Sequence, residues 1–184
     1  SIELKGAELG HDLSNAPEVV SSVVERVKKL EAEGWTFEAA DASFELLLLD
    51  AQGVHVAFEV ESWRTIVEQD ASGQVRTEAT VKVHIDGERI ISTAEGNGPV
   101  NALDRAMRRA IVQAYPDLDS LRLVDYKVRI LDEKSGTGAT TRVLIGTSDG
   151  ADSWSTVGVH ENVIAASWRA LEDAVMYGLL RRAR

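Results

Sequence analysis

Cysteine is absent from the 184 residues of this chain, which excludes a disulfide framework, a thiolate-ligated metal centre and a cysteine nucleophile. Aromatic residues make up only 5% of the chain, and proline occurs three times. The run of four leucines at 46–49 is far shorter than the ~20 apolar residues of a membrane-spanning helix. No basic segment followed by an apolar one opens the chain, so we expect no signal peptide and a cytoplasmic, globular protein with no membrane partner.

Basic residues are also outnumbered, since 20 Lys and Arg face 30 Asp and Glu and give a net charge of -10. This balance argues against a nucleic-acid partner, because binding to phosphates needs clustered Lys and Arg. Residues 1–52 carry 11 acidic and 4 basic residues, whereas residues 53–184 carry 19 and 16. Most of the excess acidity therefore belongs to the N-terminal segment, where we interpret it as the solvated face of helices.

Residue patterns typical of catalytic or metal centres are missing as well. The four histidines have no ligand spacing, and His55 and His84 are expected on a solvated strand face. No Gly-x-Ser-x-Gly sequence marks a nucleophilic serine. We therefore expect no catalytic residues, no metal and no cofactor in this chain.

The first fifty residues have the period of helices. Apolar residues recur every three or four positions from 20 to 30, which predicts an amphipathic helix that begins near Pro17 and ends at Gly34. A second helix is expected over 38–49. Together they predict a helical hairpin, and we assign residues 1–52 to a connector subdomain.

The rest of the chain shows one pattern twice: three strands followed by a helix. Alternating apolar residues and turn signals predict, in the first copy, strands at 54–68, 75–85 and 88–94 and a helix at 99–114. The second copy has strands at 121–132, 139–147 and 153–159 and a helix from about 162. Asp86-Gly87 and Ser92-Thr93 recur 63 residues later as Asp149-Gly150 and Ser155-Thr156. The sequence thus predicts an α+β fold of two βββα units, 53–118 and 119–184, with pseudo-twofold symmetry.

Glycine is concentrated where the third strand of the first copy meets its helix, at Gly96-Asn97-Gly98-Pro99. This corner lacks the Lys-Ser/Thr of a Walker loop and the third glycine of a dinucleotide fingerprint. Exposed backbone N–H groups beside a helix N-terminus can hold a small anion such as a carboxylate. A tight turn without a ligand fits the spacing equally well. In the equivalent corner, 158–162, we expect Asn162 to cap the final helix.

Two further groups of residues have plain structural interpretations. Arg105, Arg108 and Arg109 share one side of the predicted helix 99–114, where we expect a solvated polar face. The tryptophans at 63, 154 and 168 are expected in the core or at a subunit interface.

Several segments together resemble one known family, the C-terminal regulatory domain of the α-isopropylmalate synthases and citramalate synthases. The duplicated βββα order resembles that domain, and the segment 96–102 is similar to its glycine–x–glycine–proline loop and helix start. Residues 123–126 resemble the strand that follows, and 158–168 the start of the last helix. The segment 30–47 resembles the connector that precedes the domain in citramalate synthases, which favours that branch.

The resemblance implies a regulatory role within a larger enzyme. The parent enzymes condense acetyl-CoA with a 2-oxo acid in a metal-dependent TIM barrel, so this chain alone would not be an enzyme. It would act as the regulatory and dimerisation part, together with the catalytic domain of the same parent chain. The implied effector is isoleucine for the citramalate branch, bound at a homodimer interface for feedback inhibition. The alternatives are leucine, for the isopropylmalate branch, or a purely structural dimerisation module.

Residue roles follow from the same resemblance. The glycine corner would hold the effector's carboxylate, Asp125 would neutralise its ammonium group, and residues of the strand after the helix would contact its aliphatic side chain. The candidate effector-binding residues are Gly96, Asn97, Gly98, Pro99, Val100, Asn101, Leu123, Asp125, Tyr126, Ile130, Val143, Gly158, His160 and Asn162.

Overall fold

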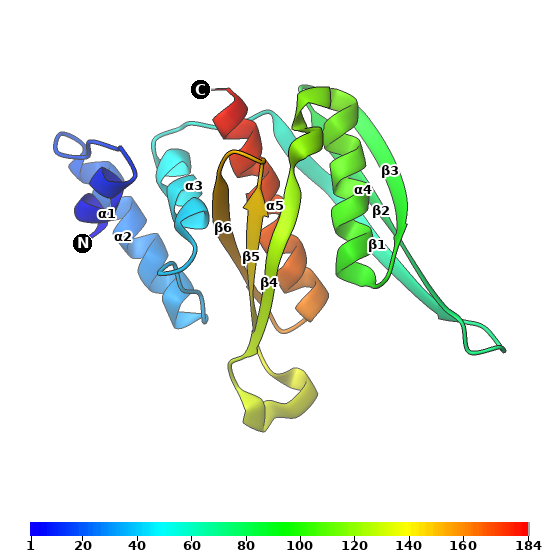
Figure 1. Cartoon of the computed structure of the whole chain (residues 1–184). Coiled ribbons are helices and arrows are strands. Elements are labelled where there is room, and N and C mark those ends of the chain that lie inside the picture. The colour runs from blue at the N-terminus through cyan, green and yellow to red at the C-terminus, as the bar shows by residue number, and fades with distance from the viewer. Residues whose placement is uncertain (184) are drawn as a thin grey trace. The chain divides into compact units, whose positions relative to one another are not determined.

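The computed structural model describes residues 1–183 and shows two three-stranded sheets, each followed by a helix (Figure 1). The helices are α1 (Ile2–Glu8), α2 (Pro17–Ala32), α3 (Asp41–Ala51), α4 (Pro99–Ala114) and α5 (Val163–Arg182). The strands are β1 (Phe58–Gln69), β2 (Val75–Ile85), β3 (Glu88–Gly96), β4 (Arg122–Ile130), β5 (Thr141–Ser148) and β6 (Ser153–His160). Short 3-10 helices occupy Pro116–Ser120 and Glu133–Gly138. The predicted α+β fold with repeated βββα units is confirmed.

The chain forms two compact units, which we describe separately. The α4 unit contains residues 56–124 together with 147–153. The α5 unit contains residues 1–55, 125–146 and the chain from Trp154 onward, so the N-terminal helices share a unit with the second sheet and its helix. Among the described residues, the helices are all too short or too polar to cross a membrane.

The sheet of the α4 unit is a meander in the order β1-β2-β3, with α4 on one face. Antiparallel pairing runs from Phe58 opposite Ile85 to Gln69 opposite Val75, and from Ile85 opposite Glu88 onward. The odd-numbered residues of β2 from 77 to 85 are buried, as period-2 alternation requires. They pack beneath the apolar face of α4, in which Leu103, Met107 and Ile111 are fully buried.

The turn between β2 and β3 follows the hairpin prediction. Asp86 and Gly87 both have positive φ, at 51° and 80°, which is the backbone of a type I′ turn. The hydroxyl of Tyr115, the residue that ends α4, donates a hydrogen bond to the Asp86 carboxylate. The side chain thus fixes the one non-glycine residue that the described chain places at positive φ.

In the α5 unit, α5 lies very close to the backbone of β6. The Trp154 Nε1–H and the Thr156 hydroxyl donate to the carbonyls of Ala174 and Ala170, at 3.2 and 2.7 Å. Gly158 continues the same face of β6, and a Cβ atom there would lie 1.9 Å from the Ala166 carbonyl oxygen. The helix can therefore approach this closely only because residue 158 has no side chain.

Ser43 on α3 joins three elements of the α5 unit. The Val157 N–H of β6 donates to its hydroxyl oxygen at 3.0 Å, and the hydroxyl donates to the Asp173 carboxylate of α5 at 2.8 Å. Burial raises the pKa of Asp173 to about 6, although the Arg169 guanidinium and the Ser43 hydrogen bond both favour the charged form. Around this seam the apolar residues Val23, Phe44 and Val157 form the core of the unit.

The sequence patterns placed most elements within a few residues, and the differences have local causes. Helix α1 was not predicted; it starts where the Ser1 side chain accepts a hydrogen bond from the Leu4 N–H. Helix α3 begins at Asp41 instead of 38, because the backbone of Ala40, at φ -140° and ψ 56°, is not helical. In the loop before it, Phe37 stacks on Trp35 and packs edge-on against Phe44 of the helix. Strand β1 begins at Phe58, and the expected strand start at 54 is an exposed loop.

We expect the substitution Gly158→Ala to destabilise the protein by at least about 3 kcal/mol, because its Cβ would overlap the α5 backbone. Gly138→Ala is the matched control, since a Cβ at 138 meets nothing within 4 Å, and it should change stability by less than about 1 kcal/mol. Urea unfolding of both variants measures the difference. Equal stabilities would contradict the described helix–strand contact.

Asp173 should also make stability depend on pH. Its pKa is higher in the folded protein than the ordinary 3.8, so the native state binds the proton more tightly and stability falls as pH rises from about 4 to about 6. Asp173→Asn removes this titration, and the variant's stability should fall less than the wild type's over that interval, by on the order of 2 kcal/mol. Thermal unfolding at several pH values measures both slopes, and identical slopes would refute the assignment.

Candidate effector site and family relationship

The glycine corner is formed by the end of β3 and the first turn of α4. A Cβ at Gly96 would lie 2.6 Å from the backbone nitrogen of Ala102, so the helix crosses directly over this glycine. Gly98 is the N-cap of α4 and has extended backbone, and a Cβ there would meet nothing within 4 Å. Gly96 therefore has a packing role, whereas Gly98 leaves space open in front of the helix.

The first turn of α4 presents backbone donors without a side-chain cap. The first intrahelical bond runs from the Ala102 N–H to the Gly98 carbonyl at 2.9 Å, and Pro99 has no N–H. The amides of Val100 and Asn101 precede that bond and point out of the helix end. Together with the helix dipole they favour a small anion. The Asn101 side chain accepts the Asn97 N–H at 3.0 Å, so one donor of the corner is already engaged.

The corner between β6 and α5 satisfies its own donors. The Asn162 side chain accepts the N–H groups of Ile164 and Ala165, at 2.9 and 3.1 Å, which confirms the predicted cap. The Asn162 N–H donates to His160 Nδ1 at 2.9 Å. This corner has the geometry of a plain capped helix start, unlike the one before α4.

Strand alternation separates the candidate residues of β4 into two sets. Asp125 forms an ion pair with Lys127 at 3.4 Å, two residues along the same face. Tyr126 points to the opposite face, where its hydroxyl lies 2.7 Å from that of Ser167, whose own proton goes to the Val163 carbonyl. Leu123 shares the parity of Asp125 and Ile130 that of Tyr126. Val143 on β5 is fully buried.

The even-numbered residues of β4 from Val124 to Ile130 form an apolar stripe on the face that Tyr126 shares with α5. We call this set the β4 stripe: Val124, Tyr126, Val128 and Ile130, with exposures of 59%, 37%, 45% and 51%. Four consecutive apolar positions on one strand face rarely stay in water. By its composition and exposure the stripe is a contiguous apolar surface on this strand.

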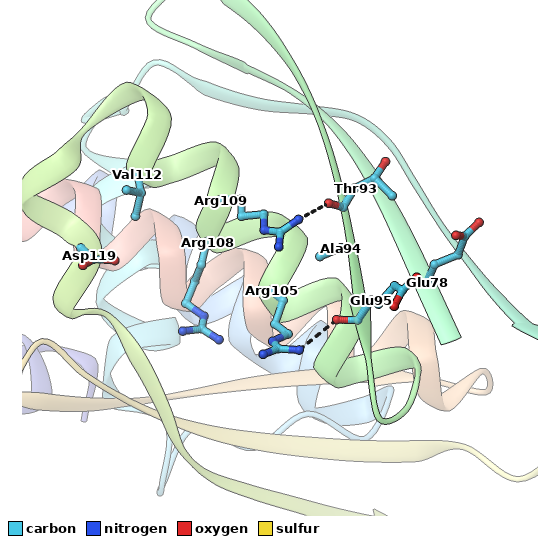
Figure 2. A pocket seen from close by; sticks show the side chains of 9 residues that line it. All are labelled: Glu78, Thr93, Ala94, Glu95, Arg105, Arg108, Arg109, Val112 and Asp119. Carbon is cyan, nitrogen blue, oxygen red and sulfur yellow. Dashed lines mark hydrogen bonds between the residues drawn. The ribbon is translucent and has the colours of Figure 1, made fainter. Parts of the chain in front are cut away.

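Arg105 and Arg109 on α4 are exposed, as expected of a solvated face, and both also donate hydrogen bonds to the sheet. Figure 2 shows Arg105 and Arg109 donating to the carbonyls of Glu95 and Thr93, at 3.2 and 2.8 Å, along the free edge of β3. Arg108 pairs with Asp104 at 3.1 Å, and burial is the main influence that raises the pKa of Asp104. The three arginines belong to the lining of a hollow of about 770 Å³. The carboxylates of Glu78 and Glu95, which also line it, point away from the arginines (Figure 2).

The described part of the chain also places the histidines and their carboxylate neighbours. No group of three or more His, Asp or Glu residues there has the arrangement of a metal site. His84 and Arg89 share the carboxylate of Glu61, and the Arg89 hydrogen bond lowers the pKa of Glu61 to about 2. His55 lies exposed beside Asp50.

Sequence reasoning missed two features that bear on the site. One is the pair of hydrogen bonds from Arg105 and Arg109 to the β3 edge. Their spacing of four places both arginines on one helix face, which allows these bonds but does not require them. The other is Val128, whose alternation with Tyr126 and Ile130 marks it as part of the stripe. That alternation was visible in the sequence, but it cannot tell an exposed face from a buried one.

Comparison with known proteins gives a consistent relationship. The family described as the LeuA allosteric (dimerisation) domain matches residues 38–179. The (R)-citramalate synthase of Streptomyces coelicolor is 64% identical over 183 residues, which are 98% of this chain and 34% of that protein. The (R)-citramalate synthase of Aquifex aeolicus is 43% identical over 176 residues, 95% of this chain and 33% of that protein. A 2-isopropylmalate synthase of Parafrankia sp. is 31% identical over 105 residues, 57% of this chain and 17% of that protein.

The chain spans about a third of the length of the curated citramalate synthases that it matches. The match to the family covers both βββα units and helix α3. On this relationship and the observed fold, the chain belongs to the LeuA allosteric (dimerisation) domain family.

Proposed function

We propose that this chain is the regulatory and dimerisation part of a citramalate synthase, a transferase of amino-acid biosynthesis. Its effector in this proposal is isoleucine, the end product of that branch, and binding would inhibit the catalytic domain of the same parent chain. The identity to citramalate synthases extends over nearly the whole chain, whereas the 2-isopropylmalate synthase matches little more than half of it. That difference favours isoleucine over leucine.

The observation that carries the ligand proposal is the uncapped N-terminus of α4. Asn162 closes the equivalent end of α5 with its own side chain, but α4 has glycine at the N-cap and no side-chain hydrogen bond there. A glycine N-cap leaves space in which a carboxylate can accept the Val100 and Asn101 amides. A free amino acid carries such a carboxylate. The roles expected of Leu123, Asp125, Tyr126, Ile130 and Val143 toward the rest of the effector stay predictions.

The observation that supports dimerisation is the β4 stripe. Burying an exposed apolar side chain contributes roughly 1.5–3 kcal/mol, so a second copy covering this face would gain substantially. A two-fold arrangement places the same strand of both copies at the interface. The proposal therefore assigns the stripe to contact between copies of this chain.

A purely structural dimerisation module remains the competing hypothesis, since the β4 stripe alone would satisfy it. The two hypotheses differ in one respect. A regulatory domain gains stability from its effector as RT ln(1 + [L]/Kd), and a structural module gains none.

We expect isoleucine at 100 times its Kd to stabilise the protein by about 2.7 kcal/mol, and Gly98→Val to abolish this gain. The valine side chain would fill the space in front of the α4 amides, although its Cβ meets no atom of the fold. Gly138→Val, at another open position, is the control and should keep the full shift. Differential scanning calorimetry with isoleucine, leucine and the remaining amino acids measures the shifts. No shift with any amino acid would leave the structural module as the better hypothesis.

The variant Gly98→Ser sharpens the same test. Serine at an N-cap supplies an oxygen that accepts the first-turn amides, so it should stabilise the free protein by a few tenths of a kcal/mol while competing with the effector carboxylate. We expect the unliganded melting temperature to stay level or rise and the isoleucine shift to shrink. An undiminished shift would remove the α4 amides from the site.

Val128→Asp should convert the dimer to a monomer, because it places a charge in the centre of the β4 stripe. Arg129→Asp is the control, since it places the same carboxylate on the opposite face of the same strand and changes the net charge by one unit more. Sedimentation velocity of both variants gives the masses. A dimeric Val128→Asp protein would show that the interface lies elsewhere.

A further inference from the structure

A second cavity lies within the α5 unit, apart from the corner at α4. It has a volume of about 250 Å³. Helices α2, α3 and α5 and the loop after α2 contribute its lining. That volume lies just below the usual range for ligand pockets, so an occupant must be small.

One side of the cavity is apolar. Trp35 and Phe37 stack with their ring centroids 6.4 Å apart, and the other apolar residues of the lining are Leu30, Leu46, Leu47 and Met176. This wall suits a short aliphatic or aromatic body.

The other side ends in the buried carboxylate of Asp173. Its side chain is 9% exposed, and its partners are the Ser43 hydroxyl at 2.8 Å and Arg169 Nε at 3.8 Å. A carboxylate has about four acceptor positions, so most of its capacity is free. Burial disfavours a charge that is this sparsely paired, and a closer cation would relieve that cost.

Arg169 is the cation nearest to this carboxylate in the salt-bridge geometry, but its contact with Asp173 is long. Its side chain is 48% exposed, its contact with Asp173 is at the outer limit of an ion pair, and its guanidinium lies 5.8 Å from the Trp35 ring centroid. Cations bind over a tryptophan face at distances of this kind. The arginine therefore marks a position between a carboxylate and an indole where a positive charge is stable.

The charges around the cavity favour a cationic occupant. Arg26 is already paired with Asp50 at 2.6 Å. Besides this pair the lining contains one cation, Arg169, and two carboxyl groups, those of Asp173 and Glu172. Burial raises the pKa of Glu172 as well. A neutral or anionic occupant would leave this excess of carboxylate uncompensated.

We infer that this cavity binds a small protonated amine with an apolar body, whose ammonium group takes the place of Arg169 between Asp173 and Trp35. The apolar body then lies on Phe37, Leu46 and Met176. The inference does not rest on the proposed amino-acid effector, because its residues belong to different elements from the α4 corner.

Isopentylamine is the probe, and isopentanol, which has the same body without the charge, is its control. Calorimetric titration of the whole chain at pH 7 should show the amine binding at least tenfold more tightly than the alcohol, with a change in tryptophan fluorescence. Equal affinities, or no binding of the amine at millimolar concentration, would overturn the inference.

Variants locate the binding. Asp173→Asn should weaken amine affinity at least tenfold, while Asp41→Asn, which removes the same charge from an exposed position on α3, should leave it within about twofold. Leu46→Trp enlarges a side chain of the lining, leaves Asp173 unchanged, and should weaken binding at least tenfold even if Asp173→Asn does not fold. Arg169→Met removes the competing cation and should tighten binding, an effect that a merely structural arginine would not give. Weaker binding by Arg169→Met, or undiminished binding by Leu46→Trp, would contradict the inference.

Gly98→Val separates the two proposals. It should bind isopentylamine as the wild type does, whether or not it responds to isoleucine. Loss of amine binding in this variant would show that the amine occupies the α4 corner and would overturn the cavity assignment.

Discussion

The contact of a helix backbone with a strand glycine is the constraint on which both halves of this fold depend. Gly96 beneath α4 and Gly158 beneath α5 allow approaches that any side chain would block, at 2.6 and 1.9 Å from a hypothetical Cβ. Each contact fixes how its helix lies on its own sheet, and thereby which residues that helix buries. It also fixes where the first turn of the helix begins. The two corners, and the difference between them, follow from this packing.

That difference is the main functional argument. The two repeats share a strand order and a glycine contact, yet only the second closes its helix with a capping side chain. Asn162 and His160 accept hydrogen bonds from backbone N–H groups at the start of α5. At the start of α4, Gly98 has no side chain to accept such bonds, and the space beside it is open. The two copies therefore have the same strand order but different helix starts. The helix without a side-chain cap, α4, is also the one whose corner contains two glycines, Gly96 and Gly98.

Much of the fold could be predicted from the sequence because local signals agreed with the tertiary structure. The alternation in 75–85, the Asp86-Gly87 turn and the stripe of α4 each specify one structure, and those elements appear where expected. The site could be predicted less well. Alternation assigns Asp125 and Tyr126 to opposite faces of β4, so residues adjacent in sequence point in opposite directions. The contacts of Arg105 with β3 and of Ser43 with Asp173 join residues 10 and 130 positions apart, and no local pattern encodes the latter.

Side chains engage backbone groups of the edge strands β3 and β6, which bears on how other chains can pair with these strands. Arg105 and Arg109 occupy carbonyls along the free edge of β3, and Ser43 accepts an N–H of β6. Backbone groups engaged in this way cannot template another strand, which is the usual route to open-ended fibres. Strand addition is thereby hindered at these carbonyls and this N–H. In the proposed dimer the copies instead meet through the side chains of the β4 stripe, and a two-fold contact of that kind is complete once a single partner has bound. Arg105 and Arg109 thus oppose strand addition along one edge of the sheet in the α4 unit.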